Sequence, residues 1–259
     1  MTLRLRENFI AFKTIFNKEI YRFARLWIQT IVPPAITTTL YFIIFGELLG
    51  ANIQPIHGYK YIDYIIPGLI MLSVINNAYA NVVSSFFGAK FQRHIEELLV
   101  SPASPFVILL GFTCGGIARG MAVGAVVTCI AYFFSPIRIV HPGLMILITL
   151  MTALLFSLGG LINAIFAKKF DDTNIVPTFI LLPLTYLGGI FYSIEFLPDV
   201  WKQISLANPI LYMINAFRYS WLGTSDVSIA AALSIVGVLL AFLFVWAWFL
   251  LQKGIGIKQ

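Results

Sequence analysis

Few side chains in this sequence have the type and spacing that catalysis needs. The three histidines, His57, His94 and His141, all fall in polar breaks between long apolar stretches, and no His-Glu-x-x-His pair is present. Cys114 and Cys129 lie within one apolar stretch, where a thiol is usually a small core residue. No glycine-rich loop ends in Gly-Lys-Ser/Thr, the pattern that cradles nucleotide phosphates. We therefore expect no catalytic residue, no metal site and no cofactor bound by this chain.

One charged residue lies deep inside an apolar stretch. Arg119 is near the midpoint of residues 106–134, where a charge costs about 2.5–3.5 kcal/mol on membrane-insertion scales. It should therefore face the interior of a helix bundle or a wet cavity. Glu47 and Asp63 are possible partners, although both are shallower. Arg119 could line or gate a path, or it could clamp two helices together.

A second polar cluster lies in the apolar stretch 64–87. Asn77 and Asn81 are four residues apart and share one face of a helix. Hydrogen bonding between helices is the plainer role for such amides, and lining a path is the alternative.

The elements that must hold these residues are long and apolar. The sequence is 59% hydrophobic and 11% charged, whereas a soluble domain carries about 25% charged residues. A helix needs about 20 apolar residues to cross a bilayer, and a barrel would show alternating segments rather than continuous runs. The sequence therefore predicts an all-α membrane protein with six transmembrane helices. The predicted spans are 27–50, 64–87, 106–134, 143–166, 176–192 and 229–251.

The basic residues indicate the orientation of the predicted spans. With the N-terminus in the cytoplasm, twelve lysines and arginines fall in inner segments and four in outer ones. Basic residues are retained on the cytoplasmic side, so both termini are predicted to be cytoplasmic. The net charge of +6 then reflects loops beside anionic membrane lipid, and no nucleic-acid partner is needed to explain it.

Two inner segments have amphipathic patterns. Residues 5–25 place apolar side chains on one face, which predicts a helix lying in the membrane interface or packed on a soluble partner. Residues 88–102 read as a short helix with Phe91, Ile95 and Leu98 on one side. Arg93 and Glu97 would form an i,i+4 pair on the other side. This segment could dock a partner or could be a solvated connector.

The outer segment between the last two predicted spans is also unusual. It has too many prolines to span the membrane and is too apolar for a free loop. Short helices that dip into the outer leaflet are predicted, and irregular backbone at that depth must be buried in protein. The alternative is an interfacial belt of aromatic side chains.

Three stretches, together with their order and spacing, resemble the permease subunits of type-2 ABC exporters over nearly the whole chain. They are Ile66–Met71 continuing to Pro102, Pro183–Pro198, and Asn208–Arg218. The last is the most specific, and its motif residues are Asn208, Pro209, Tyr212 and Arg218. The resemblance is closest to a small subgroup from the bacterial inner membrane.

The resemblance implies a division of labour within one permease domain, residues 1–259. Residues 5–25 would be the connecting helix, 88–102 the coupling helix that docks the ATPase, and 193–221 the outer re-entrant helices. The coupling residues would be Phe91, Arg93, Ile95, Glu96, Glu97 and Leu98. Two copies would pair, and two separate cytoplasmic ATPase subunits would bind ATP and Mg. Spans two and five would line the cavity, with Asn77, Asn81, Thr185 and Tyr186 toward the substrate.

The expected function is therefore export of a lipid-like, glycan or amphipathic substrate, since few charges are available to line a cavity. An ATP-independent secondary carrier or channel is the alternative. A proton-driven carrier would be expected to hold an acid or a histidine deep in a span, and the acids here lie near the span ends. A membrane scaffold or an enzyme is the weakest of the three hypotheses, because the sequence contains no recognisable set of catalytic residues.

Overall fold

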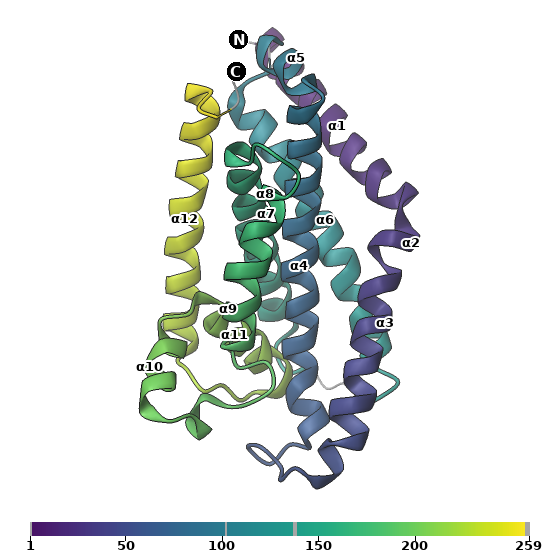
Figure 1. Ribbon diagram of the computed structural model, residues 1–259, viewed down its shortest axis with the longest axis vertical. Helices are drawn as coiled ribbons and strands as arrows, with labels where there is room; N and C mark the ends of the chain where they lie inside the picture. The colour runs from purple at the N-terminus through teal and green to yellow at the C-terminus, as the bar shows by residue number, and fades with distance from the viewer. Residues whose placement is uncertain (1, 102, 137–138, 257–259) are drawn as a thin grey trace.

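The protein is a bundle of helices (Figure 1). The computed structural model describes residues 2–101, 103–136 and 139–256, and no strand occurs in those ranges. Five helical segments are long and apolar enough to cross a membrane, and they coincide with five of the six predicted spans. They are Trp27–Gly46, α4 (Tyr61–Phe91), α6 (Pro105–Ala131), α7 (Pro142–Phe166) and α12 (Ile229–Lys253).

The first span is an interrupted helix. It consists of α2 (Trp27–Thr30), α3 (Val32–Tyr41) and the π-helical turn η1 (Phe42–Leu48), followed by the 3-10 turn η2 (Gly50–Asn52). Pro33 and Pro34 lie at the beginning of α3, where a missing backbone N–H costs no helical hydrogen bond. The proline pair therefore marks the start of a new helix.

The predicted span 176–192 is shorter in the structure. Its helical part runs through α8 (Asp172–Val176), the π-helical turn η3 (Pro177–Leu181) and α9 (Leu182–Tyr186). Fifteen residues rise about 22 Å, which is less than the roughly 30 Å of a hydrocarbon core. A sixth crossing therefore stays a prediction.

The turn before α8 is fixed by the side chain of Asp172. Its carboxylate accepts hydrogen bonds from the backbone N–H groups of Lys168 at 2.8 Å and Lys169 at 3.0 Å. These bonds stabilise the charged carboxylate and lower the pKa of Asp172.

The core forms around α4, which packs against α6 and α7 with most of its side chains buried (Figure 1). Three glycines of α6 spaced four residues apart, Gly116, Gly120 and Gly124, face α4. A Cβ atom on Gly116 would lie 2.5 Å from a methyl of Val82. Small residues at this spacing let helix backbones approach closely, which drives packing in a bilayer.

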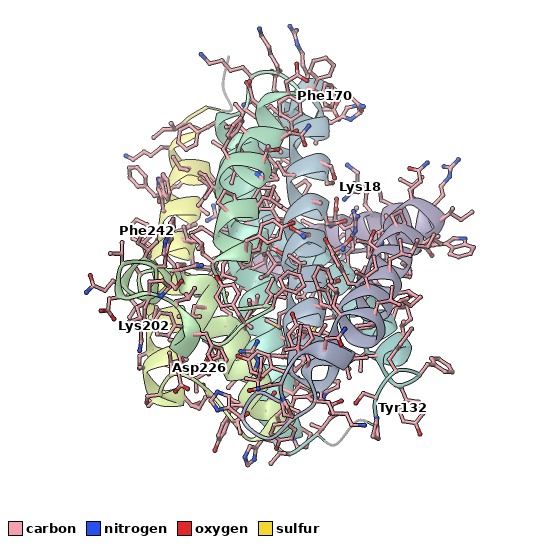
Figure 2. All side chains as sticks on the ribbon, turned by 60° about the horizontal axis from the view of Figure 1, so that its bottom comes forward. Lys18, Tyr132, Phe170, Lys202, Asp226 and Phe242 are labelled. Carbon is pink, nitrogen blue, oxygen red and sulfur yellow. The ribbon has the colours of Figure 1, made fainter. Side chains whose placement is uncertain are left out.

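Both termini lie at one end of the bundle, beside the short helix α5 (His94–Val100) (Figure 1). Because the sequence predicts that both termini are cytoplasmic, we refer to this end as the inner end and to the opposite one as the outer end. Phe170 is at the inner end, whereas Tyr132 and Asp226 are at the outer end (Figure 2). The outer segments are η4 (Ile194–Phe196), α10 (Asp199–Leu206) and α11 (Pro209–Leu222).

The first helix, α1 (Thr2–Arg25), runs diagonally down the side of the bundle and packs against α6 (Figure 1). Leu5 and Phe9, two apolar residues of this helix, are 65% and 67% exposed, and a position in the membrane interface stays a prediction. Ile15 and Glu19 are buried instead and form its contact with the bundle.

Candidate functional site

The short helix α5 protrudes from the inner end of the bundle. Arg93 takes a left-handed conformation, with φ of +63°, which ends the turn after α4 and begins α5. Ile95 is fully buried and anchors α5 in the core. Glu96 and Glu97 lie in the first turn, where carboxylates interact favourably with the helix dipole, and both are exposed.

Two details predicted for residues 88–102 are wrong. Phe91 is the last residue of α4 rather than part of the α5 face, and its exposed ring contacts Phe170 at a centroid distance of 4.9 Å. Arg93 precedes α5, so it does not share a helical face with Glu97, and no ion pair joins these two side chains. Pro102 lies outside the described residues.

A cleft of about 440 Å³ separates α1 from α5. Lys18 of α1 lines one side, and Glu97 and Leu98 of α5 line the other. The cleft is lined by exposed side chains of opposite charge, Lys18 and Glu97. The predicted coupling residues Glu97 and Leu98 therefore adjoin the predicted connecting helix.

Next to this cleft, the buried carboxylate of Glu19 holds α1 against the bundle. Glu19 is 0% exposed, and it accepts hydrogen bonds from the Ser85 hydroxyl, from Asn81 Nδ2 at 3.3 Å and from Arg22 Nη2 at 3.1 Å. The close approach depends on α6, because a Cβ on Gly115 would lie 2.5 Å from Cβ of Glu19. A Cβ on Gly111 would lie 2.6 Å from a methyl of Ile15.

The importance of this close contact can be tested with Gly115→Val. The branched side chain must push α1 away from α6, since overpacking typically costs about 1–3 kcal/mol. We expect a lower thermal unfolding temperature and increased hydrogen exchange along α1. Gly143→Val is the matched control, because no atom lies within 4 Å of a Cβ at that position. Equal behaviour of the two variants would contradict the close packing of α1.

Two arginines meet the predicted asparagine pair on α4. Arg22 Nη2 donates to Asn81 Oδ1 at 2.7 Å and to the Asn81 carbonyl at 2.8 Å. Arg119 Nη2 donates to Asn77 Oδ1 at 3.1 Å. The structure thus brings Asn77, Asn81 and Arg119 together, with Arg22 as a member that was not anticipated.

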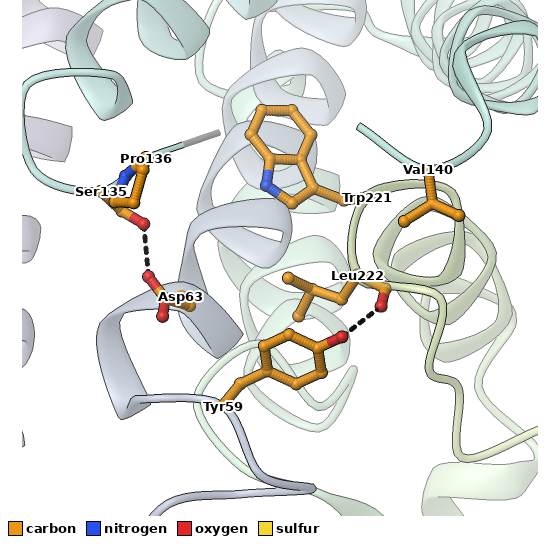
Figure 3. Close-up of a pocket in the computed structure, with 7 residues that line it drawn as sticks. All are labelled: Tyr59, Asp63, Ser135, Pro136, Val140, Trp221 and Leu222. Atoms are coloured by element: carbon orange, nitrogen blue, oxygen red, sulfur yellow. Dashed lines mark hydrogen bonds between the residues drawn. The ribbon is translucent and has the colours of Figure 1, made fainter. Parts of the chain in front are cut away.

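Of the two carboxylates considered as partners of Arg119, Asp63 forms no hydrogen bond or ion pair with it. Asp63 accepts a hydrogen bond from the Ser135 hydroxyl at the outer end (Figure 3). The side chain of Glu47 lies outside the described residues.

Thr185 and Tyr186 lie elsewhere. Thr185 is buried, and its hydroxyl donates to the Leu182 carbonyl of the same helix at 2.8 Å. Tyr186 is 51% exposed, and its ring stacks on Phe191. α9 packs against α11, so these two side chains do not join the cluster around Asn77.

The motif Asn208–Arg218 fixes α11 in place. Asn208 caps the helix by accepting from the Ile210 N–H at 3.0 Å, and its amide donates to the Leu184 carbonyl at 2.6 Å. Pro209 occupies the first turn, and the Tyr212 hydroxyl donates to the Leu206 carbonyl at 2.8 Å. These contacts hold α9, α10 and α11 together.

Arg218 is fully buried at the outer end. Its guanidinium lies 3.8 Å from the centre of the Tyr64 ring and donates to the carbonyls of Gly189 at 2.6 Å and Tyr64 at 3.3 Å. The arginine therefore joins α11 to α4 and to the loop after α9.

Asp226 is a second polar junction at the outer end, and no pattern in the sequence distinguishes this residue. Its buried carboxylate lies 3.1 Å from His57 Nε2 and accepts from the Ile194 N–H at 3.3 Å and the Tyr64 hydroxyl at 3.4 Å. Its own N–H donates to Asn215. Asp226 therefore links the loop at His57, the segment at Ile194 and α11, which are far apart in the sequence.

A pocket of about 310 Å³ lies beside these ties (Figure 3). The Tyr59 hydroxyl donates to the Leu222 carbonyl at 2.6 Å across one side of it. With the Ser135–Asp63 bond, these contacts fasten the outer loops to α4 and α11.

An all-helical chain with five membrane-length helices and arginines in its buried polar clusters is a multi-pass membrane protein. Residues 10–222 match the sequence model of ABC-2 type transporters. The chain therefore belongs to the ABC-2 type transporter family, as the resemblance predicted.

Similar proteins agree with this assignment. The chain is 54% identical over 251 residues to the inner membrane transport permease YadH of Escherichia coli strain K12, covering 96% of this chain and 98% of that protein. It is 20% identical over 215 residues to nodulation protein J of Rhizobium leguminosarum bv. viciae, covering 83% of each chain. The likeness to YadH confirms the predicted bacterial inner-membrane subgroup. The protein is accordingly a multi-pass permease of the inner membrane.

Proposed function

We propose that this chain is the membrane-spanning subunit of an ATP-driven exporter. Two copies would pair in the inner membrane, and two separate cytoplasmic ATPase subunits would bind ATP and Mg. The observation that carries the proposal is the placement of α5, with Glu96 and Glu97 exposed beside the cleft against α1. Membership of the ABC-2 family supports it, because permeases of this family typically act with a separate ATPase.

The contacts of α1 suggest how movement at the inner end would reach the bundle. Glu97 and Leu98 line the cleft together with Lys18, and the carboxylate of the next residue of α1, Glu19, binds to Ser85 and Asn81 of α4. A partner that moves α5 against α1 would therefore pull on α4, which packs against α6 and α7. The proposed movement is passed on by packed, hydrogen-bonded helices rather than by a flexible loop.

The outer end would be the exit. Its loops are tied to one another by Asp226 and by the Tyr59–Leu222 bond, and we infer that an outward-opening movement would have to loosen these ties. Opening would require these few hydrogen bonds to exchange with water. The substrate would be lipid-like, a glycan or amphipathic, in keeping with the small number of charges in the spans.

The first experiment is purification of a tagged chain from gently solubilised membranes. We expect an ABC ATPase to co-purify at close to one-to-one stoichiometry, with ATP hydrolysis that vanadate inhibits. A chain that purifies alone and transports solutes without ATP would contradict the proposal and support a secondary carrier.

The docking role of α5 can be tested by reversing both exposed charges, with Glu96→Lys and Glu97→Lys combined. Reversal places like charges against a surface that complements the acids, and we expect ATPase binding to weaken by at least about tenfold. Co-purified ATPase and ATP-dependent transport are the measurements. The matched control reverses two exposed outer acids, Glu195→Lys with Asp199→Lys. Normal transport and normal ATPase content in the α5 variant would refute the docking assignment.

A further inference from the structure

We propose that Arg22 and Arg119 form a binding site for a phosphate-type anionic group on the face of α4 that carries Asn77 and Asn81. The proposal deepens the proposed function and rests on it, since it names an anionic lipid-like molecule as the substrate class. The site would hold the headgroup while the apolar part stays among the helices.

The charges in this region do not balance. Two guanidinium groups lie beside Asn77 and Asn81; Glu19 contacts that of Arg22, and among the described side chains no carboxylate pairs with Arg119. Glu19 already accepts three hydrogen bonds, from Ser85, Asn81 and Arg22. One positive charge is therefore left without an anion, in a place where uncompensated charge is costly.

Each of the two arginines has a hydrogen-bond donor without an acceptor. The Nε atoms of Arg22 and Arg119 are buried and have no hydrogen-bond partner. A buried donor without an acceptor costs about 1–3 kcal/mol, so an acceptor that reaches these atoms would be stabilised. Arginine presents its donors in a planar fork, and that geometry matches the oxygens of a phosphate.

The spacing of the two guanidinium groups also suits such a group. Asn77 and Asn81 are separated by one helical turn, a rise of about 6 Å, and each holds one guanidinium by its amide oxygen. The amide oxygens fix the positions of the two cations without neutralising them. The pair could therefore grip one or two adjacent phosphate groups.

The site lies at membrane depth. Asn77 is near the middle of α4 and Arg119 near the middle of α6, whereas Arg22 is one turn closer to the inner end and is 27% exposed. A headgroup could thus enter from the inner side past Arg22. A second copy of the chain would bring the same two arginines and one carboxylate, so pairing of two copies repeats the excess charge.

The test compares the thermal unfolding of lipid-stripped permease with and without added lipid. The variants are Arg119→Gln and Arg119→Lys, and Lys13→Gln is the control for loss of an exposed charge on α1. The probes are phosphatidylglycerol, the zwitterionic phosphatidylcholine, and inorganic pyrophosphate. Size-exclusion profiles report whether each variant is folded.

We expect phosphatidylglycerol to raise the unfolding temperature of the wild type and of Lys13→Gln by at least about 3 °C. Phosphatidylcholine should do so much less. Arg119→Gln should weaken the anionic effect by about tenfold or more, and Arg119→Lys should keep part of it. Stabilisation by pyrophosphate alone would show that the free anion suffices, whereas its failure beside a strong lipid effect would show that the lipid tail is required.

The variant without lipid distinguishes a binding site from a structural clamp. If Arg119 awaits an anion, lipid-stripped Arg119→Gln should be as stable as the wild type or more stable, because it removes an uncompensated charge. A clear loss of stability without lipid, or equal responses to both lipids in the wild type, would overturn the proposal. Co-purification of the ATPase is measured on the same samples, so failure of this site and failure of the exporter assignment are separate results.

Discussion

Replacement of Glu19 by alanine is expected to destabilise the protein by about 3–5 kcal/mol, the usual cost of removing one partner from a buried charge cluster. The carboxylate is fully buried and accepts hydrogen bonds from Ser85, Asn81 and Arg22. Its loss removes the acceptor of the Ser85 hydroxyl and of the Asn81 amide, and it leaves Arg22 without a counter-charge. Equilibrium unfolding of the purified permease in detergent is the measurement.

Glu7→Ala is the matched control, because Glu7 is an exposed acid on the same helix. Surface changes of this kind usually alter stability by less than about 0.5 kcal/mol. Glu19→Gln should fall between the two, since the amide keeps an acceptor oxygen and loses the charge. If Glu19→Ala were as stable as Glu7→Ala, the carboxylate would not be what holds α1 to the bundle.

The same change should also affect coupling. Glu19 joins α1 to α4, and α1 lines the cleft against α5. With that link removed, we expect the ATPase to remain bound while transport falls more than ATP hydrolysis does. A parallel loss of both activities would indicate that the variant is merely unstable.

Much of the architecture could be predicted because one physical rule governs it. A continuous apolar run of membrane length must be a helix in a bilayer, and five predicted spans rest on that rule. The segment 176–192 satisfies the same rule by composition. Pro177 and Pro183 divide it into short helical pieces, and the backbone leaves the helix after Tyr186.

The candidate site was harder to predict, because it depends on which helices approach closely. The periodicity of residues 5–25 indicates an amphipathic helix but gives no sign that Glu19 is buried. That burial follows from Gly111 and Gly115 of α6, which admit the backbone of α1. The glycines are visible in the sequence, whereas the helix they face is not. Asn77, Asn81 and Arg119 could be chosen because polar groups are expensive at membrane depth.

Replacement of Arg218 by methionine is the second change with a large expected effect, also about 3–5 kcal/mol. The guanidinium is fully buried and donates to the carbonyls of Gly189 and Tyr64. Methionine would donate to neither carbonyl and would lose the cation–π contact with Tyr64. Asp226 would also remain buried without this nearby cation, although His57 and the Ile194 N–H still contact it.

The damage should be confined to the outer end at first. Arg218 joins α11 to α4 and to the loop at Gly189, so hydrogen exchange should rise in residues 187–198 and 222–228 before it rises in α6 or α7. Lys60→Met is the control, since Lys60 is an exposed outer cation. Arg218→Lys should recover only part of the stability, because an ammonium group lacks the planar fork that reaches two divergent carbonyls. Full recovery of stability by lysine would mean that only the charge matters at this position. Unchanged hydrogen exchange in Arg218→Met would mean that Asp226 and Tyr59 suffice to hold the outer loops together.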